Sequence, residues 1–116
     1  MNLNPIFEAM QEKVGYPVEQ DMYQGKERIY GIYCYTDERG AVFGNNKPLI
    51  DIAYMRLQIY TPKNFNYMDI KHRTRDYLEE QGFTITSIGT WLEPDFDNEA
   101  EKIRCTAISM QYAGIH

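Results

Sequence analysis

An acidic segment between residues 93 and 101 offers oxygen ligands of the kind that bind metal ions. It contains Asp95, Asp97, Asn98, Glu99 and Glu101, and carboxylate and amide oxygens are the ligands that calcium takes in proteins. An EF-hand loop also needs glycine at its sixth position and glutamate at its twelfth, and neither stands in register here. Alternating carboxylates are also typical of a solvated sheet edge. Three interpretations stay open: a solvated edge, a negative surface that faces a partner, and a metal site.

Histidine, a frequent catalytic side chain, occurs only twice, at positions 72 and 116. His72 lies between Lys71 and Arg73, which is typical of an exposed helix surface. A nucleophile, a base and an orienting group cannot be assembled from this inventory. The sequence has no phosphate-binding glycine motif and no paired Cys/His metal spacing. We therefore expect no catalytic activity, no cofactor and no resident metal.

A group of basic residues accompanies the predicted second helix. Lys71 and Arg75 are four residues apart and share a helix face, but acidic residues follow directly at positions 76, 79 and 80. This alternation favours an exposed face of mixed charge over a nucleic-acid groove, with a partner-facing role as the alternative. The basic residues are Lys63, Lys71, Arg73 and Arg75.

The segment from residue 37 to residue 48 separates two predicted strands by more residues than a hairpin needs. Long loops that persist in compact domains often bind something. Hydrophobic residues in its middle would be exposed unless a partner covers them or they fold back onto the core. We expect a binding loop whose candidate contact residues are Arg39, Val42, Phe43, Asn45 and Lys47.

Two predicted helices position these segments. Apolar residues at helical spacing predict a first helix, with Asn4 as its cap, Pro5 at its first position and Gly15 at its end. A second helix is predicted for residues 67–81, with Asn66 as its cap and Gly82 as its left-handed stop. The apolar positions of the first helix are Leu3, Ile6, Phe7, Met10 and Val14.

Five further segments have the composition of strands: residues 18–23, 28–36, 52–60, 83–92 and 103–112. The third alternates clearly, so that one of its faces belongs to the core. The resulting order, α-β-β-β-α-β-β, predicts an α+β fold in one domain, residues 1–116. We expect a largely antiparallel sheet of about five strands with both helices on one face. The core-facing residues of the third strand are Ala53, Met55, Leu57 and Ile59.

Composition narrows the class of protein. The chain has 116 residues and a formal charge of -5, with 43% hydrophobic and 25% charged residues, which are ordinary values for a globular domain. No apolar run is long enough to span a membrane and no secretion signal is visible, so the expected compartment is the cytoplasm.

Cys34 and Cys105 are interpreted as small buried hydrophobes. The 10 tyrosines suit either a protein interface or a tyrosine-rich sheet face.

Five segments spread over nearly the whole chain carry a resemblance: residues 3–10 (LNPIFEAM), 15–18 (GYPV), 33–40 (YCYTDERG), 59–67 (IYTPKNFNY) and 80–83 (EQGF). With them the chain resembles the tail-completion proteins of long-tailed phages and prophages, which include tail terminators and head–tail joining proteins. These segments are structural signatures and not catalytic ones.

The resemblance implies an α+β fold of two helices and an antiparallel sheet, in a non-enzymatic virion component. Such proteins oligomerise, commonly as a six-fold ring, which caps the tail tube and joins it to the head. Its partners would be further copies, the tail tube protein and head–tail connector proteins, without a membrane. The protein would be made in the bacterial cytoplasm and reside in the virion tail.

DNA must pass through such a ring without specific binding, and a negative lining would repel its phosphates. We therefore hypothesise that one of two segments faces the lumen or the tail tube. The candidates are residues 37–48 and the acidic segment with Asp95, Asp97, Glu99 and Glu101. The alternative is a monomeric, acidic, tyrosine-rich binding module that regulates or neutralises a basic protein partner. A third possibility, a small enzyme, would use carboxylates such as Asp51, Asp69 or Glu80.

Overall fold

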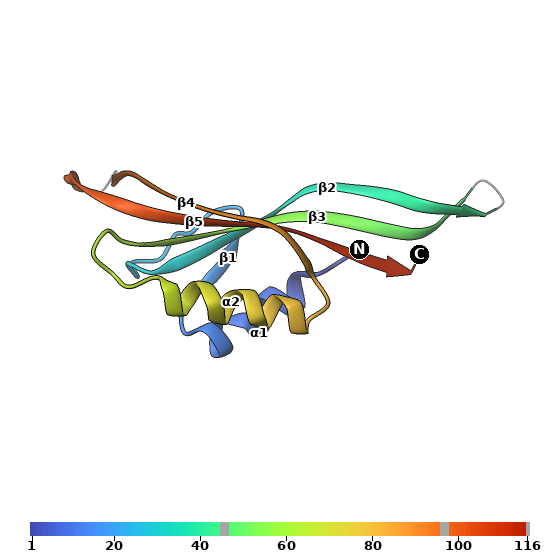
Figure 1. Cartoon of the computed structure of the whole chain (residues 1–116), viewed down its shortest axis with the longest axis horizontal. Helices are drawn as coiled ribbons and strands as arrows, with labels where there is room; N and C mark the ends of the chain where they lie inside the picture. The colour runs from blue at the N-terminus through green and yellow to red at the C-terminus, as the bar shows by residue number, and fades with distance from the viewer. Residues whose placement is uncertain (45–46, 96–97, 116) are drawn as a thin grey trace.

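The computed structural model describes residues 1–44, 47–95 and 98–115, and its helices and strands follow the predicted order. The strands form one sheet in the order β1-β2-β3-β5-β4, and both helices lie on the same face of it (Figure 1). The predicted α+β class is therefore confirmed. The elements are α1 (Asn4–Val14), β1 (Val18–Gln20), β2 (Tyr30–Gly44), β3 (Lys47–Pro62), α2 (Met68–Glu80), β4 (Thr84–Asp95) and β5 (Asn98–Ile115).

The sheet is mixed, with one parallel pair at its edge. β2, β3, β5 and β4 are antiparallel to their neighbours, whereas β1 runs parallel to β2, with Val18 opposite Gly31. The segment between β1 and β2 carries the chain back to the starting end of the sheet, so the two strands share a direction. The prediction of a largely antiparallel sheet holds for every pair except this one.

Residues 37–48 do not form the long loop that we expected. β2 continues to Gly44 and β3 begins at Lys47, with Glu38 opposite Ala53 and Gly44 opposite Lys47. The pairing shifts register three times between Tyr35 and Phe43. Each shift breaks the two-residue alternation from which a strand is recognised in sequence. The segment is therefore the distal part of a β-hairpin.

The acidic segment is likewise more regular than predicted. β4 runs to Asp95 and β5 starts at Asn98, and Glu93 lies opposite Ile103. Residues 93–101 thus belong mostly to two paired strands and not to a connection between shorter ones. Asp, Asn and Pro are depleted in strands, which is why composition alone assigned this stretch to a turn.

These two hairpins extend from opposite ends of the sheet (Figure 1). The molecule measures 58 × 24 × 23 Å along its principal axes, and the helices cover only the central part of one sheet face. We call residues 37–44 and 47–54, with the end of β5 beside them, the β2–β3 arm. We call residues 93–95 and 98–102 the β4–β5 arm. Both termini lie near the β2–β3 arm in Figure 1.

The core lies between the helices and the centre of the sheet. The predicted alternation of β3 is confirmed, because Ala53, Met55, Leu57 and Ile59 are all at most 1% exposed. Phe7 stacks on Tyr33 with their ring centroids 4.2 Å apart. The predicted apolar face of the first helix is confirmed as well, since it supplies the buried residues Phe7, Met10 and Val14, and α2 buries Thr74, Tyr77 and Leu78.

The helix stops were predicted more accurately than the caps. Gly15 and Gly82 adopt left-handed φ values of 83° and 102° after the two helices, which glycine does without steric cost. Asn4 is wrong as a cap, because it is itself the first helical residue and Leu3 takes the N-cap position. Asn66 is one residue too early, although its side-chain oxygen accepts a hydrogen bond from the Met68 amide at 3.3 Å.

Candidate interaction surface

The sheet face opposite the helices carries a row of residues at one level of four strands, aromatic on β2, β3 and β4 and a cysteine on β5. Tyr30 on β2 lies opposite Tyr60 on β3, Tyr60 opposite Cys105 on β5, and Cys105 opposite Trp91 on β4. Tyr60 and Ile59 are adjacent in the strand, so their side chains point to opposite faces, and Ile59 is in the core. We call Tyr23, Tyr30, Tyr60, Cys105 and Trp91 the aromatic row.

Ring stacking holds one half of the aromatic row in place. The rings of Tyr23 and Tyr30 are 4.3 Å apart and 14° from parallel, and those of Tyr30 and Tyr60 are 5.1 Å apart and 22° from parallel. Such pairs contribute about 0.5–1.5 kcal/mol each beyond their buried area. Trp91 lies at the other end with 41% of its surface exposed, and its indole N–H donates to Glu93 Oε2 at 3.0 Å.

The aromatic row is electrically neutral at physiological pH. Burial, together with a smaller contribution from nearby Glu93, raises the pKa of the Cys105 thiol to about 11. Burial also raises the pKa of the Tyr60 hydroxyl above its ordinary value of 10.0. Both groups therefore keep their protons under physiological conditions, and the aromatic row itself carries no charge.

The rest of this face contrasts with the helical side of the molecule. By the register of the strands it carries Ile32, Cys34, Gln58, Ala107 and Ser109, with the exposed Arg56 among them. On α2, by contrast, Arg73 pairs with Asp69, and Arg75 pairs with Asp76 at 2.9 Å. Protein interfaces are depleted of charged residues at their centre and enriched in Tyr, Trp and Arg. The uncovered sheet face matches that composition.

The charged surface of α2 agrees with its prediction. His72 is exposed, Arg75 also lies 3.8 Å from Glu79, and Arg73 Nη1 donates to the Val14 carbonyl at 3.4 Å. The basic residues of this helix are thus interleaved with acidic partners, as expected for an exposed face of mixed charge. The interpretation of the cysteines holds for Cys105, which is fully buried, but not for Cys34, which is half-buried.

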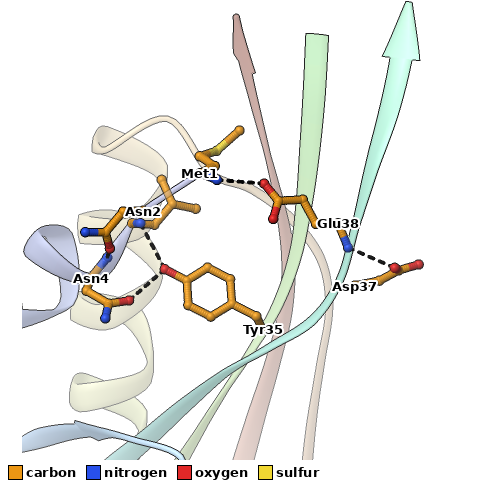
Figure 2. Close-up of polar contacts among 7 residues, drawn as sticks. Met1, Asn2, Asn4, Tyr35, Asp37 and Glu38 are labelled. Carbon is orange, nitrogen blue, oxygen red and sulfur yellow. Dashed lines mark hydrogen bonds and ion pairs between the residues drawn. The ribbon is translucent and has the colours of Figure 1, made fainter. Parts of the chain in front are cut away.

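The N-terminal segment is fastened to the base of the β2–β3 arm (Figure 2). The α-amino group of Met1 lies 2.9 Å from Glu38 Oε1, and this contact raises the pKa of the amino group. The Tyr35 hydroxyl accepts a hydrogen bond from the Leu3 amide at 2.9 Å and donates to Asn4 Oδ1 at 2.7 Å. These contacts tie the helical layer to the arm through side chains.

The residues predicted to contact a partner lie on both arms and do not form one cluster. Arg39 is exposed on the β2–β3 arm, 2.5 Å from Asp37 Oδ2, with its guanidinium 5.7 Å from the Tyr54 ring centre. Lys47 is exposed on the same arm. Asn45 and Asp97 lie outside the described residues. The backbone of the remaining five predicted contact residues lies in strands, but their side chains are not among the described parts of the structure: Val42, Phe43, Asp95, Glu99 and Glu101.

An open groove of about 720 Å³ lies between the end of α1 and the segment before β2. Its charged lining residues, Lys26, Glu27 and Arg28, are consecutive in sequence. The Tyr16 side chain at its wall is directed inward, where its hydroxyl lies 2.6 Å from Thr74 Oγ1.

The described residues form neither a metal-binding cluster nor a membrane-spanning helix. Within residues 1–44, 47–95 and 98–115, no three His, Cys, Asp or Glu side chains gather as a metal site would require. Within the same ranges, neither helix has the length and apolarity needed to cross a membrane. The metal interpretation of the acidic segment depends on side chains beyond this description and stays a prediction.

Sequence reasoning missed the aromatic row as a unit. The tyrosine count and the alternation of β3 placed Tyr60 on the face away from the core, but Trp91 was not singled out. The missing information was register, because the row exists only when four strands align at one level. A comparison of the chain with protein-family models and with curated proteins finds no match.

Proposed function

We propose that the chain is a non-enzymatic tail-completion protein of a long-tailed phage or prophage. In this proposal six copies form a ring that caps the tail tube and joins it to the head. The observation that carries the proposal is the uncovered, nearly uncharged aromatic face of the sheet. An uncovered sheet face of this composition is best explained by a protein partner.

The shape of the molecule supports a ring in particular. A ring needs a heterologous interface, in which two different surfaces of one chain meet on neighbouring copies. The sheet has two different arms at its ends and two different strands at its edges. Each copy therefore offers unlike surfaces in opposite directions, as head-to-tail assembly requires.

The charge of the chain supports the passage of DNA through such a ring. At -5 per chain, six copies carry a strongly negative total charge, which repels phosphates at close range. DNA would then move through the opening without being held. The remaining surfaces would serve the tail tube protein below and a head–tail connector above, in a virion assembled in the bacterial cytoplasm.

The same face also supports a second candidate, a monomeric binding module for a basic protein partner. The acidic charge would speed association with such a partner, and the aromatic row would supply the buried contact. The two candidates differ in oligomeric state. A module works as a single chain, whereas a ring does not exist without its neighbours.

Absolute mass by light scattering, measured across protein concentration and with or without magnesium, tests the proposal. Six chains of 13.7 kDa form a species of about 82 kDa, and that mass is the expected result. A mass of one chain at every concentration would contradict the ring. If that monomer also bound a basic protein in a salt-dependent manner, the binding module would be the better conclusion.

A further inference from the structure

β4 forms one edge of the sheet along its whole length. It spans Thr84–Asp95 and pairs with β5 on one side, and the strand order places it last. Among the described residues no strand lies on its outer side. Half of its backbone N–H and C=O groups therefore face outward, which makes the strand a template for pairing with another chain.

This edge has few of the features that protect free edges. From Thr84 to Leu92 the sequence contains no charged residue and no proline, and Trp91 and Leu92 are 41% and 39% exposed. Monomeric proteins usually place lysine, proline or bulges at such positions. A bulge follows Ile85, but Ser87 to Pro94 pair regularly with β5. The pattern is that of an edge covered by a partner.

The opposite edge of the sheet is open in a different place. β1 covers β2 only from Gly31 to Tyr33, so the outer side of β2 toward Gly44 has no neighbouring strand in the described chain. The N-terminal segment reaches this part through the side chains of Tyr35 and Glu38. The Glu38 amide of this part donates to Asp37 Oδ1 at 2.8 Å, and no strand of the described chain covers the remaining backbone positions.

We propose that β4 of one copy pairs with the distal part of β2, residues 36–44, of the next copy. The inference rests on the proposed ring and names the seam between its protomers. Pairing of β4 with β4 would close at two copies and leave both β2 edges uncovered. The β2 edge carries Asp37, Glu38 and Arg39, whereas β4 has no charged residue from Thr84 to Leu92, so the two edges are unlike, as a heterologous contact requires.

Two measurements test this seam. Hydrogen exchange of the assembled chain is compared with that of chain diluted below its assembly concentration. Residues 84–92 and 36–44 are expected to gain protection on assembly. In parallel, the variant S87K/L92K places lysines on the β4 edge at two exposed positions. The control Q11K/Q81K makes the same charge change at an exposed position of α1 and at the exposed residue that follows α2. The edge variant should require about tenfold more protein to assemble than the control.

The outcomes separate the seam from the ring. Wild-type rings with unchanged exchange in both segments, and with equal assembly of the two variants, would overturn the seam and leave the proposed function intact. A wild-type species that stops at two chains would overturn the six-copy ring and the β4–β2 pairing together, in favour of pairing between like edges. A wild type that never assembles would overturn the proposed function, and the seam with it.

Discussion

At the scale of single residues, the neutrality of the aromatic row follows from where its titratable groups are buried. The Cys105 thiol sits between Tyr60 and Trp91 in register and is inaccessible to water. A thiolate there would lose its hydration and lie near Glu93, and these two effects outweigh the attraction of Arg56, which is why the pKa is raised. Cys34, on the neighbouring part of the same face, is only half-buried.

The raised pKa of Cys105 predicts a loss of stability at alkaline pH. The folded-state pKa of about 11 exceeds the ordinary value of 9.0, so the unfolded chain releases this proton first. Stability from this group is complete below about pH 9 and declines as the pH rises toward 11, by at most about 2–3 kcal/mol. Urea unfolding from pH 7 to 11 measures the decline. The C105A variant should show a smaller one, and an equal decline would contradict the assignment.

A second residue-scale prediction concerns the buried pair of Tyr16 and Thr74. Their hydroxyl oxygens are 2.6 Å apart, beneath α2 and far from the aromatic row. Because Tyr16 is 3% exposed, the variant T74V leaves the phenol without a partner and should cost about 1–3 kcal/mol of stability. The double variant Y16F/T74V should recover part of that loss. Chemical denaturation of the four proteins completes the cycle, and strict additivity would show that the two hydroxyls are not coupled.

At the scale of helices and strands, the sequence predicted elements best where one periodicity persists. β3 alternates without interruption over its core residues, and both helices keep an apolar stripe and end at glycine. The sequence did not predict that the arms are strands. Bulges interrupt the alternation of β2, and the acidic residues of the β4–β5 arm are uncommon in strands. The parallel pairing of β1 with β2 and the alignment of the aromatic row depend on how distant strands pair. A local sequence pattern holds no information about that pairing.

Shortening the β2–β3 arm should separate folding from function. Arg39 lies opposite Ile52, so replacing residues 40–51 by Asn-Gly joins paired positions through a two-residue hairpin turn. The core residues of β3 begin at Ala53 and remain in place. We expect a folded chain by circular dichroism, with a thermal midpoint within about 5 °C of wild type, that no longer assembles. Assembly at the wild-type concentration would show that the distal arm is dispensable.

At the scale of the whole molecule, folding and assembly make opposite demands on the same sheet. The helical face is buried within the chain, and the aromatic face stays uncovered with Trp91 at its rim. An exposed tryptophan contributes little to the folding of a single chain. Buried by a neighbour, however, it belongs to the residue type that most often dominates an interface. The W91A variant therefore separates the contribution of Trp91 to folding stability from its contribution to assembly.

For W91A we expect a change of less than about 1 kcal/mol in unfolding free energy and a loss of at least about 2 kcal/mol in assembly. The matched control is M68A, because Met68 is also 41% exposed but lies at the start of α2, away from the aromatic face. Light scattering over a dilution series gives the assembly midpoint of each variant, and urea unfolding of the dilute chains gives stability. Equal assembly of W91A and M68A would place the contact surface elsewhere on the molecule. Selective loss in W91A would establish that the uncovered sheet face, rather than exposed hydrophobic area in general, joins the copies.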